Sequence, residues 1–186
     1  METVQAGQLS DLIRRKVSDL KELCEGVDEE TASLALSGRW SPKEIVSHLC
    51  GPEGIGHLPT IHAFLDKDTP RLDIEVENPF FSEDRARMTF AELLAKFEGE
   101  YNRMAEFVSG LSEEQLSRRA HILILKEAPM GEFPTLAEWI KAIGEYHLGW
   151  HTDHMREILA ALRAGSAIRR EHVSREEAHA ASHSGL

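Results

Sequence analysis

The stretch that decides the fold is TLAEWIKAIGEYHLGWHTDHMREILAALRA, residues 135–164. It opens with Thr135 and, three residues later, Glu138, a capping box of the kind that begins α-helices. Apolar residues then recur every three or four positions, among them Leu136, Ile140 and Ile158, which is the period of a helix with one buried face. The stretch therefore predicts one long helix that packs its apolar face against other helices.

The same capping chemistry marks the start of three more helices, at Ser41, Thr89 and Ser112. Each of these residues is followed three positions later by Glu or Gln and then by apolar residues at helical spacing. Capping and periodicity together predict long helices over about residues 9–25, 41–65, 90–109 and 136–164, with short helical turns near 28–30 and 111–117.

The remaining segments predict connections rather than strands. Glycines and prolines within residues 51–59 should interrupt the second long helix. Residues 66–88 have the composition of a long connection, and residues 121–125 that of an extended piece. Four long amphipathic helices without a convincing set of strands predict an all-α four-helix bundle over residues 1–165, followed by a polar, flexible tail over 166–186.

Composition and charge exclude several classes of protein. The chain has 186 residues, of which 41% are hydrophobic and 28% charged, the profile of a globular protein with a core of its own. Its 21 Lys and Arg residues against 32 Asp and Glu residues give a net charge of −11, which repels phosphate backbones and anionic membrane surfaces. No run of about 18 apolar residues and no secretory signal pattern is present, and Cys24 and Cys50 fit no zinc or redox spacing. We therefore expect a cytoplasmic protein that binds neither nucleic acid nor membrane.

Histidines carry the functional signal of the sequence. On a regular α-helix, His147, His151 and His154 fall within about 60° of one another, in the middle of the apolar stripe. An imidazole buried there is costly unless it finds a hydrogen-bond partner or a metal ion. His147 and His151 are four residues apart and can bind one ion, with His48 on the second helix as the leading candidate for a third ligand. The plainer interpretation is that these histidines are core residues with ordinary hydrogen bonds.

Other catalytic templates are absent from the sequence. It contains no glycine-rich phosphate loop, no G-x-S-x-G, no H-E-x-x-H and no C-x-x-C. His57 and His62 follow Gly51 in the irregular part of the second helix, and we expect them at the surface or in the wall of a pocket. No catalytic residue beyond candidate metal ligands is identified.

Two segments of the sequence resemble the DinB-like superfamily. GRWSPKEIVSHL, residues 38–49, is similar to the W-S-x-x-E-hydrophobic-x-x-H-hydrophobic opening of that superfamily's second helix. The TLAEW sequence at 135–139 and the H-x-x-x-H-x-x-H sequence at 147–154 resemble the start and centre of its last bundle helix. The resemblance runs in order over about residues 9–164. The superfamily includes mycothiol-dependent isomerases and related metal-dependent hydrolases.

The resemblance implies an up-down-down-up bundle, often dimeric, with a divalent ion held by His48, His147 and His151. A shifted register, set by the distance to Ile158, would instead place the pair at Trp150 and His154 and lose one ligand. We favour the first register because it keeps a complete pair, with His154 as an alternative or fourth ligand. Glu44, one turn before His48, is a candidate to orient the His48 ring, or else only a capping residue.

Two functions from different classes follow. The first is a metal-dependent enzyme that acts on a small molecule by transfer or isomerisation with a thiol cofactor, or by hydrolysis. Its cofactors would be a divalent transition metal, Zn or Ni first, and a low-molecular-weight thiol, and the resemblance implies a homodimer. The second is a non-enzymatic bundle that has lost the metal site and binds a ligand or a protein.

Overall fold

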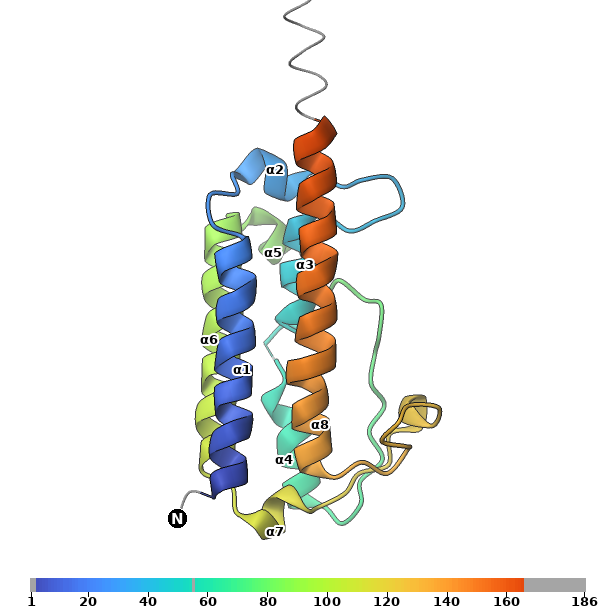
Figure 1. Ribbon diagram of the computed structural model, residues 1–186. Helices are drawn as coiled ribbons and strands as arrows, with labels where there is room; N and C mark the ends of the chain where they lie inside the picture. Colours follow the sequence, from blue (N-terminus) through green and yellow to red (C-terminus); the bar gives the residue numbers. More distant parts are fainter. Residues whose placement is uncertain (1–2, 55, 166–186) are drawn as a thin grey trace, which may run out of the picture.

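The computed structural model describes residues 3–54 and 56–165, and these form a bundle of four helical columns (Figure 1). The first column is α1 (Val4–Leu23), the second is α3 (Pro42–Leu49) followed by α4 (Leu58–Asp66), and the third is α6 (Phe90–Ser109). The fourth begins with α8 (Leu136–Ala142) and continues through the π-helical η2 (Ile143–Leu148) into an α-helix over 149–165. Short helices occupy the connections: α2 (Glu29–Ser33), α5 (Glu83–Arg87), α7 (Glu113–Leu116) and η1 (Leu123–Leu125).

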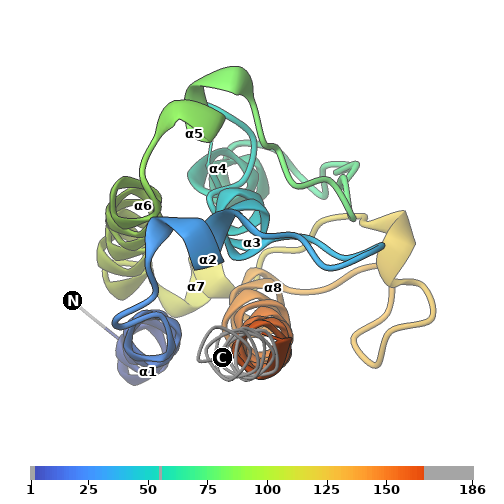
Figure 2. The same cartoon turned by 90° about the horizontal axis from the view of Figure 1, so that it is seen from above.

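The columns run up, down, down and up in chain order (Figure 1). Seen from above, they stand at the corners of a square, with α1 beside α6 and the fourth column between α1 and α3 (Figure 2). This arrangement confirms the all-α four-helix bundle with long connections. The predicted tail, 166–186, lies outside the described residues. Within those residues, none of the helices combines the length and the apolar character needed to cross a membrane.

All four capping boxes form where the sequence predicts them. In each, the hydroxyl of the capping residue accepts a backbone N–H three residues on, and the side chain there accepts the N–H of the capping residue. At α3, for example, Glu44 Oε2 lies 2.7 Å from the Ser41 backbone nitrogen. These contacts involve only neighbours in sequence, and for that reason the helix starts are readable without the fold.

One predicted helix has a different start in the structure, and another is interrupted where the sequence predicts it. The first helix begins at Val4 rather than near Leu9, because Thr3 Oγ1 accepts the Ala6 N–H at 3.1 Å and caps an extra turn. The second column is broken between α3 and α4, where Gly51, Gly54 and Gly56 adopt positive φ angles.

The segment 121–125 is not extended, which corrects the sequence-based prediction. His121 makes one isolated bridge to Arg71, and Leu123–Leu125 form a single 3₁₀ turn. An extended segment needs a neighbouring strand to satisfy its backbone groups. The described part of the chain offers no strand beyond isolated bridges at this position.

The π-helical turn η2 changes which face of the fourth column is buried. A π turn inserts one residue into the helix and so rotates all that follows by about 100° relative to an uninterrupted α-helix. From Leu148 onward, the buried residues of the fourth column are Leu148, His151, Thr152, Met155, Ile158, Leu159 and Leu162, and the face that they form is centred near Leu148 and Met155. The three histidines therefore lie on the flank of the buried face, toward α3, and not in its middle as the regular wheel predicted.

An ion pair between the buried Lys43 and the exposed Glu29 joins three helices at the upper end of the bundle. Lys43, only 5% exposed, donates through Nζ to the Met88 carbonyl and to Glu29 Oε1, both at 2.6 Å. Glu29 Oε2 in turn accepts the Phe90 backbone N–H at 2.7 Å. The hydrogen bond from Lys43 is the main reason that the pKa of Glu29 is lowered. The pair thus connects α2 and α3 to the start of α6.

We expect Lys43→Met to destabilise the protein by about 1 to 2 kcal/mol, because it leaves the Met88 carbonyl without its side-chain donor and breaks the hydrogen bond to Glu29. Urea unfolding followed by circular dichroism measures the change. Lys141→Met is the matched control, since Lys141 forms an exposed pair with Glu145 at 3.6 Å. It should stay within about 0.5 kcal/mol of the wild type. Equal losses in the two variants would contradict a structural role for the Lys43 pair.

Candidate metal centre

His48 occupies the last turn of α3 and is 7% exposed. Its Nδ1 lies 2.6 Å from the backbone carbonyl oxygen of Asn78, in the connection between α4 and α5. A carbonyl can only accept, so Nδ1 carries the proton of the neutral ring and Nε2 carries the lone pair. Burial lowers the pKa of His48, which favours this neutral form. The lone pair on Nε2 faces the fourth column, where His147 Nε2 lies 3.0 Å away.

His147 and His151 approach His48 from the fourth column. His147 belongs to the π turn, and His151 follows one turn later in the α-helix. The ring centroid of His48 lies 5.1 Å from that of His147 and 4.5 Å from that of His151. One ring nitrogen from each of the three histidines lies within 4.8 Å of the other two. The structure therefore brings together the residues of the favoured register.

The donor set suits a divalent transition metal. Burial, and then the charges of neighbouring histidines, lower the pKa of His147 to about 3 and that of His151 to about 2. All three rings are therefore neutral near pH 7 and present lone pairs. Two nitrogens that each bind one ion at about 2.1 Å lie about 3.0 to 3.4 Å apart, which matches the His48–His147 separation. His151 also has a buried Nδ1 without a hydrogen-bond partner.

The other predicted site residues take different positions. His154 lies outside the cluster, half-buried, with its ring 5.3 Å from that of Trp150 and 6.2 Å from that of His151. Glu44 directs its carboxylate to the backbone N–H and hydroxyl of Ser41. Its capping role is thus the one that the structure shows, and the carbonyl of Asn78 is the group that orients His48.

Several neighbours of the histidines were not identified from the sequence. The Trp40 ring lies 5.0 Å from that of His48 and stacks parallel to His151 at 6.2 Å. On another side, Phe80 stacks on His48 at 6.0 Å. Trp40 belongs to the motif that resembles the DinB-like superfamily, so a signal for it was present. No local pattern points to Asn78 or Phe80, because the fold brings them to His48 from thirty residues away.

His57 is half-buried and lies beside His147. Its Nε2 donates to the Leu49 carbonyl at 2.9 Å, and Tyr101 Oη lies 3.2 Å from the same nitrogen. Its ring centroid is 6.2 Å from that of His147. The exposed His62 points away from this group and packs against Phe107.

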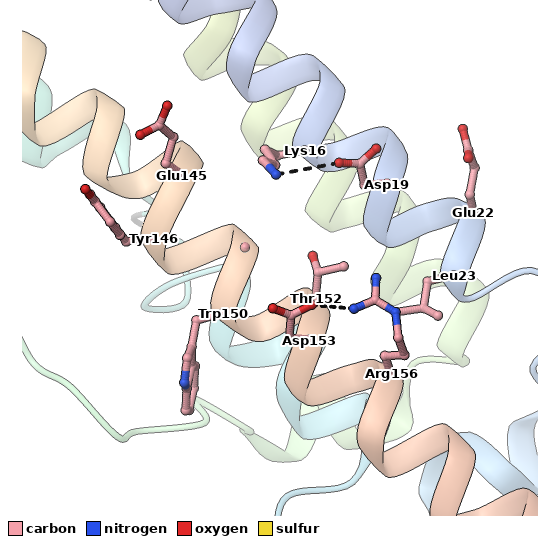
Figure 3. A pocket seen from close by; sticks show the side chains of 11 residues that line it. Lys16, Asp19, Glu22, Leu23, Glu145, Tyr146, Trp150, Thr152, Asp153 and Arg156 are labelled. Carbon is pink, nitrogen blue, oxygen red and sulfur yellow. Dashed lines mark hydrogen bonds and ion pairs between the residues drawn. The ribbon is translucent and has the colours of Figure 1, made fainter.

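An open groove of about 710 Å³ between α1 and the fourth column is separate from the histidine cluster (Figure 3). Four of its charged residues form local pairs, Lys16 with Asp19 and Arg156 with Asp153. Trp150, at its edge, contacts the His151 ring with centroids 4.6 Å apart. None of the three clustered histidines lines the groove. Two further carboxylates line it: Glu145, which pairs with Lys141, and Glu22, which forms no ion pair among the described residues.

We expect the metal-free protein to lose stability as the pH falls from about 6.5 toward 3. His147 takes up a proton far more readily in the unfolded chain, near its ordinary pKa of 6.5, than in the folded chain, where the pKa is about 3. Acid therefore favours unfolding, and the stabilisation is complete above about pH 6.5. Urea unfolding of chelator-treated protein at a series of pH values measures the slope. The free energy of unfolding should change less steeply with pH in His147→Asn than in the wild type or in the control His62→Asn. Identical slopes would show that His147 is not a source of the acid sensitivity.

Comparisons with known proteins give one match of fold. No protein-family model matches this sequence, and no curated protein matches it. Among solved structures, YfiT from Bacillus subtilis matches with a TM-score of 0.63 and 17% sequence identity, over 90% of each chain. That protein is described as a probable metal-dependent hydrolase with an unusual four-helix bundle topology. The likeness shows that this chain has the same kind of four-helix bundle fold.

Proposed function

We propose that this chain is a metal-dependent enzyme whose divalent ion is held by His48, His147 and His151. The observation that carries the proposal is the convergence of three neutral imidazoles, one of which donates its far N–H to a backbone carbonyl. Histidines that bind metals usually make this hydrogen bond, which fixes both the tautomer and the ring orientation. Three neutral ligands leave the charge of the ion uncompensated and a position free for water or substrate.

The reaction we propose is hydrolysis of a small molecule, or transfer or isomerisation with a low-molecular-weight thiol. A bound Zn or Ni ion would lower the pKa of water or of a thiol at this site. Because the three histidines are neutral, they do not repel an anion, so both hydroxide and thiolate suit the open coordination position of the ion. Trp40 and Phe80 flank His48 and keep water from two sides of it. Their rings would also contact the apolar part of a substrate.

Two likenesses support this choice. The description of YfiT as a probable metal-dependent hydrolase supports hydrolysis. The resemblance of residues 38–49 and 147–154 to the DinB-like superfamily supports the thiol reactions. The homodimer and the cytoplasmic location that the sequence suggested stay predictions.

A non-enzymatic binding bundle is the second candidate, and one distance favours it. The 3.0 Å between His48 Nε2 and His147 Nε2 is also a hydrogen-bond distance. The two rings can therefore satisfy each other if His147 carries its proton on Nε2. Metal uptake separates the candidates, because a bundle of this kind would stay metal-free after purification without a histidine tag and reconstitution with Zn²⁺ or Ni²⁺.

We expect His147→Ala and His151→Ala to lower the bound Zn²⁺ to less than about a tenth of the wild-type amount, because each removes a ligand. Both variants should keep the wild-type helix content, since the apolar core and not the metal supplies most of the stability. Elemental analysis after dialysis, together with circular dichroism, tests this. His154→Ala and the exposed His62→Ala should retain their metal. Loss of metal in His154→Ala with retention in His147→Ala would establish the shifted register instead.

A further inference from the structure

Arg85 in α5 is a fully buried cation, with an exposed fraction of 1%. Its Nη1 donates to the carbonyl of Ser47 at 2.8 Å, to the Ser47 hydroxyl at 3.3 Å and to the carbonyl of Phe80 at 3.1 Å. Nε and Nη2 are buried and have no hydrogen-bond partner. Across residues 3–54 and 56–165, no carboxylate forms an ion pair with it. Burying a charge without an opposite charge is costly. The position of Arg85 therefore needs an explanation, and its hydrogen bonds to the two carbonyls are where to look for it.

Both carbonyls belong to the backbone that holds His48. Ser47 immediately precedes His48 in the last turn of α3. Phe80 closes the turn over 77–80, and the Asn78 carbonyl in that turn accepts the proton of His48 Nδ1. In the part of the chain that the structure describes, Arg85 forms no hydrogen bond with the three histidines themselves. Arg85 is therefore linked to His48 in two ways: through the backbone of the preceding residue, Ser47, and through the turn whose Asn78 carbonyl binds the His48 ring.

The turn over 77–80 is strained and needs such support. Glu77 and Phe80 have φ angles of 59° and 47°, in the left-handed region that residues with a side chain rarely adopt. Asn78 Oδ1 accepts the Phe80 N–H at 2.7 Å, and the Ser47 hydroxyl donates to the Phe80 carbonyl at 3.0 Å. Conformations of this kind persist only where surrounding contacts hold them. Arg85 supplies the only charged contact to the Phe80 carbonyl among the described residues.

We propose that Arg85 is the positioning residue of the metal centre. By binding the carbonyls of Ser47 and Phe80, it holds α3 and the 77–80 turn together, and so keeps the Asn78 carbonyl on His48 Nδ1 and the lone pair of Nε2 toward His147. A methionine would fill a similar volume but could donate to neither carbonyl. The inference rests on the metal site proposed above.

The test compares two buried cations. Arg85→Met should weaken Zn²⁺ binding by about tenfold, because it frees the turn that holds the Asn78 carbonyl on His48, and loss of such an orienting hydrogen bond typically has an effect of this size. Lys43→Met is the matched control, because Lys43 is as buried as Arg85 but binds Glu29 and Met88, away from the 77–80 turn. It should leave the Zn²⁺ affinity within about twofold of the wild type. Titration calorimetry with Zn²⁺ alone, on variants shown to be folded by circular dichroism, gives both affinities.

A second measurement follows His48 directly. In ¹⁵N-labelled metal-free protein, the imidazole resonances report which nitrogen carries the proton and whether that proton is protected from exchange. We expect a protected Nδ1–H in the wild type and in Lys43→Met, and its loss in Arg85→Met. Arg85→Lys retains one cationic donor and should restore the signal in part. If Arg85→Met fails to fold, Arg85→Lys and Ser47→Ala provide the same comparison, since Ser47→Ala removes one bond to the Phe80 carbonyl.

The outcomes separate this inference from the function on which it rests. Wild-type Zn²⁺ affinity and a protected His48 proton in Arg85→Met would overturn the positioning role. Equal weakening in Arg85→Met and Lys43→Met would also overturn it, because general loss of stability would then explain both. If the wild type binds neither Zn²⁺ nor Ni²⁺, the proposed function fails, and the His48 resonances alone decide whether Arg85 positions that ring.

Discussion

The hydrogen bond from His48 Nδ1 to the carbonyl of Asn78, 2.6 Å long, fixes the chemistry of the whole centre. It determines the tautomer of the ring and therefore leaves the lone pair of Nε2 directed at the fourth column. Without it, the His48 ring could rotate or exchange its proton between nitrogens, and the short approach to His147 would not be specified. The contacts around the turn over 77–80, including those of Ser47 and Arg85, all support the position of this one carbonyl.

The fourth column meets two requirements at once: it places two histidines beside α3, and it keeps its apolar residues in the core. An uninterrupted α-helix would place the histidines and the isoleucines in one stripe. The π turn over Ile143–Leu148 separates the histidines from Leu136 and Ile140, because the rotation it introduces brings Leu148 and Met155 to the centre of the buried face and leaves His147 and His151 on its flank, on the side of Ile158. Gly144 belongs to this turn and allows close packing with α1, since a methyl group there would lie 3.0 Å from Leu12 Cδ2.

The two buried cations differ in what they bind. Lys43 has a carboxylate partner in Glu29 and also binds a carbonyl, so its charge is compensated and its contacts connect helices. Arg85 has only neutral partners, which belong to the backbone on either side of His48. Beside a centre built from neutral histidines, an uncompensated cation adds to a positive field. Such a field suits an anionic occupant of the free position in the proposed metal site, whether hydroxide or thiolate.

The sequence by itself determined the elements whose signals are local. Each capping box joins residues three positions apart, so Ser41, Thr89, Ser112 and Thr135 marked their helix starts before any tertiary contact was known. The pairing of His147 with His151 and the choice of His48 came from spacing and from the resemblance of their motifs.

Tertiary structure decided the rest. The π turn, the carbonyl of Asn78 and the burial of Arg85 have no local signature. Each depends on residues thirty or more positions apart meeting in the packed bundle. Such contacts form only when the buried apolar surface of all four columns offsets the loss of chain entropy.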